Sequence, residues 1–150
     1  MSIVNEMRLD FLACAANEGF ARMVISAFVL PLNPTLEQLG DIKTSVSEAV
    51  TNAVVHGYGE QGGTVRMKAA LDESGELTVE IIDNGCGIRD VRQARQPFFT
   101  TMEASESSGM GFTVMESFMD SVEVLSRPGQ GTTVRMTKRV LAPRELAREA

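Results

Sequence analysis

The sequence contains only one histidine and two cysteines among its 150 residues. Cys14 and Cys86 are far apart and form no Cys-x-x-Cys pair, so together with His56 they offer too few ligands for a structural zinc site. We therefore expect two free thiols, buried or half-buried. A hard cation held mainly by phosphate oxygens is still compatible with this composition.

Long apolar runs and basic character are also missing. No stretch of about 18 apolar residues occurs, and the first residues lack the basic-then-apolar pattern of a signal peptide. We therefore expect a cytoplasmic protein without a membrane partner. The 14 Lys and Arg residues are outnumbered by 20 Asp and Glu residues, which gives a net charge of -6. Direct DNA binding requires a basic surface, so this charge argues against it.

The remaining composition is that of an ordinary globular domain, with 43% hydrophobic and 23% charged residues. A chain of this length can bury a sizeable core as one unit, and no internal repeat or linker interrupts it. The sequence therefore predicts a single domain spanning residues 1–150.

Hydrophobic periodicity predicts an alternation of helices and strands. In the helix expected at 17–30, Arg22 lies off the apolar stripe and faces outward; the stripe consists of Phe20, Met23, Val24, Ala27 and Phe28. Either Asn33-Pro34 or Thr35 with Gln38 marks the start of the next helix. The other elements are expected as strands at 3–14, 65–71, 77–81, 121–126 and 132–138, and as helices at about 36–57, 91–95 and 108–119. The expected fold is α+β, a two-layer sandwich with helices on one face of a mostly antiparallel sheet.

The helix at 36–57 carries a polar line beside its apolar face. Glu48, Asn52 and His56 are four residues apart and project to nearly the same side. The apolar stripe beside them consists of Leu36, Leu39, Ile42, Val46, Ala49, Val50, Ala53 and Val54. Polar groups at the edge of a core must find partners or remain costly. Taken alone, the pattern is typical of solvated or capping residues, and for His56 a cap or core role is favoured over catalysis.

Two glycine-rich motifs bracket an irregular stretch from 89 to 108. An Asp-x-Gly-x-Gly motif at 83–87 ends a buried strand, and a Gly-x-Gly motif at 109–111 stands where a helix begins. Glycines let a ligand approach the backbone, and the free N–H groups of a helix start favour phosphate. Each motif alone also fits an ordinary turn or helix entry. Their order and spacing, with a loop typical of lids between them, point to a binding site.

The combination resembles the ATP-binding module shared by gyrase, Hsp90, histidine kinases and MutL, over about residues 36–138. The matching motifs are Glu48-x-x-x-Asn52, Asp83-x-Gly85-x-Gly87, Gly109-x-Gly111 and Gly131-Thr132-Thr133. Nearly the whole chain also resembles the anti-sigma F factors of endospore-forming bacteria, in the segments 5–7, 17–22, 47–53, 95–101 and 108–112. The resemblance implies a Bergerat-type ATP-binding fold with an ATP lid at about 97–108.

The resemblance also implies roles for individual residues. Glu48 would be the general base toward a serine hydroxyl, and Asn52 would hold Mg²⁺ against the ATP phosphates. Asp83 would accept a hydrogen bond from the adenine amino group, supported by Gly87 and Thr132. The full set of expected nucleotide contacts is Asn52, Asp83, Gly85, Gly87, Ile88, Thr100, Gly109, Met110, Gly111, Phe112 and Thr132.

The implied function is that of a sporulation anti-sigma factor. The chain would sequester a sigma factor of RNA polymerase (sigma F) and, as an ATP-dependent serine/threonine kinase, phosphorylate and inactivate the anti-anti-sigma antagonist. Arg22 would contact both partners, which would then compete, and the chain would form a homodimer. Two alternatives stay open: a stress-response anti-sigma kinase of the same family, and a nucleotide-gated sigma-binding module without kinase activity.

The expected lid departs from the family pattern. Residues 102–108 contain two glutamates and no lysine or arginine, whereas family lids usually carry basic residues for the γ-phosphate. Arg92, Arg95 or a partner protein would have to supply that charge. A histidine kinase fragment fits less well, because it needs an acceptor histidine on a separate helical hairpin. A gyrase or MutL relative would need a further transducer domain.

Overall fold

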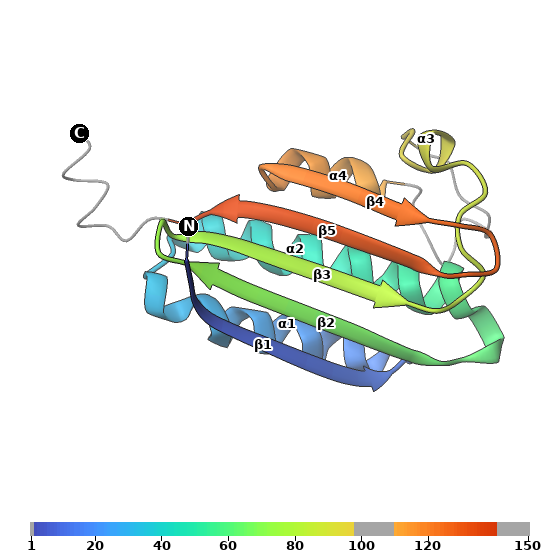
Figure 1. Ribbon diagram of the computed structural model, residues 1–150, viewed down its shortest axis with the longest axis horizontal. Helices are drawn as coiled ribbons and strands as arrows, with labels where there is room; N and C mark the ends of the chain where they lie inside the picture. The colour runs from blue at the N-terminus through green and yellow to red at the C-terminus, as the bar shows by residue number, and fades with distance from the viewer. Residues whose placement is uncertain (1, 98–109, 141–150) are drawn as a thin grey trace.

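The computed structural model describes residues 2–97 and 110–140, and these form two layers (Figure 1). Five strands make one antiparallel sheet in the order β1-β2-β3-β5-β4. Their bounds are Ile3–Leu12 (β1), Thr64–Asp72 (β2), Glu76–Asp83 (β3), Ser121–Ser126 (β4) and Thr132–Arg139 (β5). The predicted α+β sandwich is confirmed.

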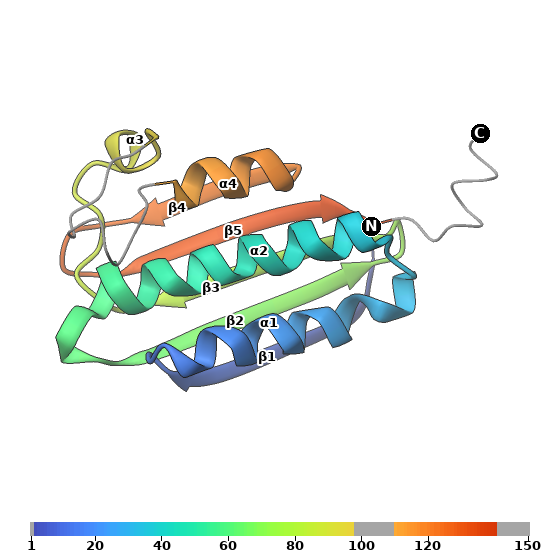
Figure 2. The ribbon, with the colours of Figure 1, turned by 180° about the vertical axis from the view of Figure 1, so that it is seen from behind.

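The three long helices lie on one face of this sheet, as Figure 2 shows from behind. The long ones are α1 (Ala16–Val29), α2 (Leu36–Asn52) and α4 (Gly111–Phe118), and the shorter ones are η1 (Leu30–Leu32), η2 (Ala53–Tyr58), η3 (Gly59–Gln61) and α3 (Val91–Ala94). Helix α2 begins with a capping box, because Thr35 accepts from the Gln38 N–H while the Gln38 side chain accepts from the Thr35 N–H. Of the two start signals in the sequence, Thr35 with Gln38 is therefore the one that is used.

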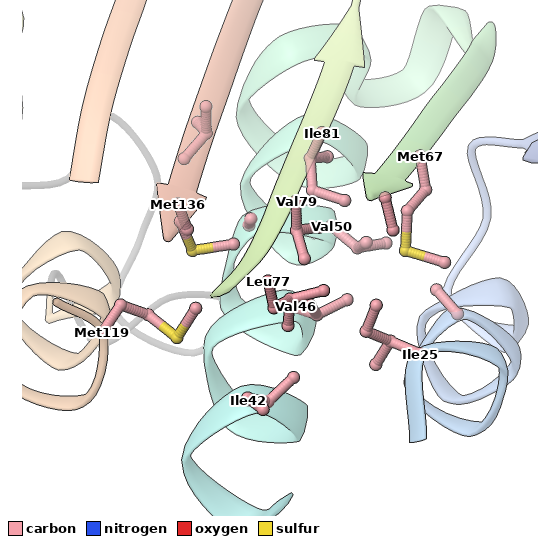
Figure 3. Packing of buried hydrophobic residues seen from close by; sticks show 14 of the residues in the cluster. Ile25, Ile42, Val46, Val50, Met67, Leu77, Val79, Ile81, Met119 and Met136 are labelled. Atoms are coloured by element: carbon pink, nitrogen blue, oxygen red, sulfur yellow. The ribbon is translucent and has the colours of Figure 1, made fainter. Parts of the chain in front are cut away.

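The core fills the space between the sheet and the helices. Figure 3 shows side chains of α1 and α2 meeting those of β2, β3 and β5, with Met119 joining them from the end of α4; the other labelled ones are Ile25, Ile42, Val46, Val50, Met67, Leu77, Val79, Ile81 and Met136. Burying one such side chain contributes about 1.5–3 kcal/mol. In β2 and β3 every second residue is buried, as the alternation in the sequence predicts.

The predicted apolar stripe of α1 is wrong in part. Ala21, Ile25 and Val29 form the buried face, whereas Phe20 is 48% exposed and Met23 is 73% exposed. Helix α1 carries apolar residues on more than one side, so periodicity alone does not select the face that packs. The face with Ala21 packs because α1 must contact both α2 and the sheet. In α2, Leu36 is exposed rather than buried, because it lies in the first turn.

Both cysteines are free, as expected, but both are exposed rather than buried. Cys14 lies in the turn between β1 and α1, and Cys86 lies in the loop after β3. Connecting loops run over the surface, which accounts for their exposure. Within residues 2–97 and 110–140 there is no helix long and apolar enough to cross a membrane and no cluster of metal-ligating side chains.

Candidate functional site

A cavity of about 480 Å³ lies where the end of α2, η2, the loop after β3 and the start of α4 meet. Figure 1 places η2, the end of β3 and α3 at the same end of the molecule. The volume is in the range of small-molecule and cofactor pockets. Seven residues expected from the sequence line this cavity: Asn52, Asp83, Gly87, Ile88, Gly111, Phe112 and Thr132.

Asp83 is the buried acid of this cavity and is only 5% exposed. Burial raises the pKa of its carboxyl, while hydrogen bonds from the backbone N–H groups of Gly85 and Thr132 partly oppose that rise. The Gly85 N–H donates to Asp83 Oδ1 over 2.9 Å. A buried carboxylate favours a ligand that donates a hydrogen bond, because such a ligand stabilises its charged form.

Glycines let the end of η2 touch the loop after β3. A β-carbon at Gly57 would lie 2.9 Å from Asp83 Cγ, and one at Gly85 would lie 2.1 Å from the carbonyl oxygen of Gly57. The Cys86 N–H donates to that same oxygen over 2.8 Å. Gly85 thus serves this backbone contact and does not line the cavity, whereas Gly87 does. Its φ of +75° is in the region that favours glycine.

The sequence predicts that the helix carrying Glu48 and Asn52 stops at Gly57, but the structure shows no such stop. From Ala53 to Tyr58 the helix continues as a π-helix, η2. Such turns are rare and are frequently found at functional sites. This segment brings His56 and Gly57 to the wall of the cavity.

Three sequence-predicted residues converge beside the cavity. A β-carbon at Gly111 would lie 3.2 Å from Glu48 Oε2 and 3.3 Å from Asn52 Nδ2, so the start of α4 lies against both side chains. Burial raises the pKa of the Glu48 carboxyl, and the negative charge of Glu18 raises it further. A carboxylate with a raised pKa is a stronger proton acceptor, as a general base requires.

The structure leaves other expected residues outside this group. Met110 does not line the cavity, and Thr100, Gly109 and the expected lid from residue 98 onward lie outside the described residues. Arg22 projects from α1, where it is partly exposed and forms an ion pair with Glu18 over 3.3 Å. It therefore belongs to the surface of α1 rather than to the cavity.

The arginines considered as substitutes for a basic lid are placed differently. Arg95 donates from Nε to Glu116 Oε1 over 2.7 Å and from Nη2 to the carbonyl oxygen of Val122, so α4 and β4 hold it. Arg92 does not line the cavity, whereas Arg89 does. Sequence reasoning missed Arg89 together with Gly57, Cys86 and Gln93. The one hint in the sequence that these residues line the cavity is that they lie near the Asp-x-Gly-x-Gly motif at 83–87 or in the helix that carries Glu48 and Asn52.

Comparisons with known proteins identify the class and the family of the chain. The family model described as a histidine kinase-like ATPase domain matches residues 11–138, which defines the class of protein. Anti-sigma F factors from Thermoanaerobacter sp. (strain X514) and Pasteuria penetrans are 52% and 51% identical, over 92% and 95% of this chain and 96% of each relative. The chain belongs to the anti-sigma F factor family.

Solved structures support the fold at lower identity. The RsbU and RsbW domains of a Mycobacterium tuberculosis protein match with a TM-score of 0.66 at 21% identity, over 91% of this chain and 33% of that chain. The catalytic domain of the histidine kinase ThkA matches with a TM-score of 0.57 at 14% identity, over 91% of this chain and 97% of that chain. The ATPase class implies that the protein binds a nucleotide.

Proposed function

We propose that the protein is an anti-sigma factor that sequesters a sporulation sigma factor and also acts as an ATP-dependent serine kinase on the anti-anti-sigma antagonist. The observation that carries the kinase half is the convergence of Glu48, Asn52 and Gly111 at the edge of a cavity whose wall holds Asp83. The family at 52% identity supports the anti-sigma half. The nucleotide-binding core spans about residues 36–138, the lid spans about 97–108, and the protein works in the cytoplasm.

The cavity fits an adenine nucleotide. The buried Asp83 carboxylate accepts from the adenine amino group, and Ile88 and Phe112 supply apolar wall for the base. Asn52 offers one amide oxygen for Mg²⁺, which binds through few protein ligands and keeps phosphate oxygens and waters as the others. The metal neutralises the charge of the phosphates when it is bound. Residues 100 and 109–111 contribute the remaining nucleotide contacts.

Phosphoryl transfer needs mainly positioning and charge neutralisation. Glu48 orients the incoming serine hydroxyl and takes up its proton. Glu48 is half-buried beside Gly111, which shields part of its carboxyl from water. Its raised pKa increases its basicity as long as the working pH stays above that pKa.

Partner binding uses the outer surface of α1. Arg22 is exposed there, and Phe20 and Met23 are exposed on the same helix. Arginines and aromatic residues are frequent among the residues that dominate protein–protein interfaces. The sigma factor and the anti-anti-sigma protein both bind this surface and therefore exclude each other. A second copy of the chain binds elsewhere, along the edge strand β1.

A phosphotransfer assay tests the kinase. The protein, Mg-ATP and an anti-anti-sigma protein are mixed, and phosphoserine on that partner is measured beside a Glu48→Gln variant. Phosphoserine with the wild type, and its loss in the variant while ATP still binds, is the expected result. ATP binding without phosphoserine from either protein would contradict the kinase.

That second outcome would favour a nucleotide-gated sigma-binding module. The observation behind this alternative is the segment 102–108, which has two glutamates and no lysine or arginine for the γ-phosphate. Arg95 is already bonded to Glu116. Sigma-factor binding that changes between ATP and ADP, with no phosphate transferred, would identify the module.

A further inference from the structure

The hydroxyl of Tyr58 joins three segments of the chain next to the cavity. It donates a hydrogen bond to the carbonyl oxygen of Thr64 over 2.6 Å, and it accepts one from the N–H of Asn84 over 2.7 Å. Tyr58 is the last residue of η2, Thr64 begins β2, and Asn84 directly follows Asp83. One hydroxyl therefore fixes the backbone position immediately after the buried acid.

The ring that carries this hydroxyl is itself held in place. A β-carbon at Gly63 would lie 2.4 Å from Tyr58 Cε1, so the ring rests directly on the backbone there and only glycine leaves the space. Tyr58 also packs against the hydrophobic core. A ring seated in this way holds its hydroxyl at one point.

The neighbouring contacts show why that point matters for Asp83. The backbone of Gly57, the residue before Tyr58, lies against the Asp83 carboxylate, and the Gly85 N–H donates to Asp83 Oδ1. These contacts restrain the carboxylate from the η2 side and from the loop. The hydrogen bond from the Asn84 N–H to the Tyr58 hydroxyl restrains the main chain between Asp83 and Gly85.

We infer that Tyr58 is a positioning residue for adenine recognition, which acts by holding the main chain after Asp83 so that the carboxylate meets the amino group of the base. The inference rests on the proposed nucleotide function. Tyr58 does not line the cavity, so its effect on the ligand passes through Asp83. A displacement of about 1 Å in a binding group is enough to lose a hydrogen bond of good geometry.

The test compares two nucleotides on wild type and Tyr58→Phe by calorimetry with Mg²⁺ present. One is ATP, and the other is purine riboside triphosphate, in which hydrogen replaces the 6-amino group of adenine. The wild type should prefer ATP by about tenfold, as expected for a hydrogen bond to a charged group. Tyr58→Phe should lose most of this preference by weakening ATP binding, with the affinity for the analogue unchanged.

A merely structural role for Tyr58 would weaken both nucleotides equally, and that result would overturn the inference, as would an unchanged preference. The control is Ser117→Ala, which removes an exposed hydroxyl that donates to the Thr113 carbonyl on α4 and does not line the cavity; its preference should equal that of the wild type. A wild type that binds no nucleotide would instead refute the proposed function. A wild type that binds both nucleotides equally would refute adenine recognition by Asp83, and with it the inference.

If Tyr58→Phe does not fold, hydrogen exchange on the wild type still decides the question. ATP should slow exchange of the Asn84 N–H more than the analogue does, because only ATP tightens the Asp83 segment. Equal slowing by both nucleotides would contradict the positioning role.

Discussion

Asp83 lowers the stability of the fold at neutral pH while offering the acceptor that we propose for the adenine amino group. Because burial raises the pKa of its carboxyl, the native state holds the proton more tightly than the unfolded state does. At a pH below the unfolded pKa the carboxyl is protonated in both states and costs nothing. As the pH rises through the unfolded pKa toward the folded pKa, the free energy of unfolding falls. It stays reduced above that pH.

Asp83→Asn should therefore stabilise the protein at neutral pH while weakening ATP binding by about tenfold or more. The amide oxygen keeps the acceptor for the Gly85 N–H, and no charge has to be buried. Thermal unfolding at a series of pH values checks the first part, and calorimetry with ATP checks the second. A stability difference that does not grow between acidic and neutral pH would contradict the argument.

At the scale of the element, helix α1 packs with one face and leaves another for the proposed partner binding. Its buried face is occupied by Ala21, Ile25 and Val29, which leaves Arg22 and its apolar neighbours on the outside. Arg22→Ala should weaken binding of the sigma factor and of the anti-anti-sigma protein by about tenfold or more, because arginines are frequent hot spots. The ion pair with Glu18 is exposed and contributes at most about 1 kcal/mol, so the fold should persist.

The measurement is co-purification of each partner with wild type and variant, beside calorimetry with ATP. A matched control is Arg66→Ala, which also breaks an exposed ion pair, with Asp10 on the sheet. Both partners should still bind this control. If Arg22→Ala retains both partners at wild-type strength, α1 is not the shared surface.

Elements with strong periodicity could be predicted from the sequence, and those set by tertiary contacts could not. The alternation in β2 and β3 identified their buried sides, and the Thr35 signal identified the start of α2. The face of α1 and the π-helical end of α2 depend on which neighbours pack against them. For the cavity, the sequence motifs contain several of the residues that line it, such as Asp83. The contribution of Tyr58 arises from Thr64 and Asn84, which are 6 and 26 residues away along the chain.

At the scale of the whole molecule, β1 offers an edge for the proposed homodimer. Among the strands of the described structure, β1 pairs only with β2, so its other edge is open for pairing. Met7 packs toward the core, while Glu6 and Arg8 are exposed on the opposite face of the sheet. Arg8 also lies directly opposite Lys68 of β2, a like-charge neighbour that favours an acidic group on its other side.

Antiparallel pairing of two β1 strands about Met7 would supply that group. It places Glu6 opposite Arg8 of the partner subunit, and it does so twice by symmetry. Glu6→Arg and Arg8→Glu should each weaken the homodimer by about tenfold at low salt, because both pairs turn repulsive. Mixing the two single variants should restore dimers as heterodimers, since every Arg then faces a Glu.

Sedimentation equilibrium and native mass spectrometry measure these populations. The double variant Glu6→Arg with Arg8→Glu should dimerise like the wild type, because both opposite-charge pairs are restored in exchanged positions. A general loss of folding or solubility cannot produce this pattern, since two defective variants would not rescue each other. Recovery in the mixture and in the double variant therefore ties dimerisation to this register of β1, whereas dimers of unchanged strength in both single variants would place the interface elsewhere.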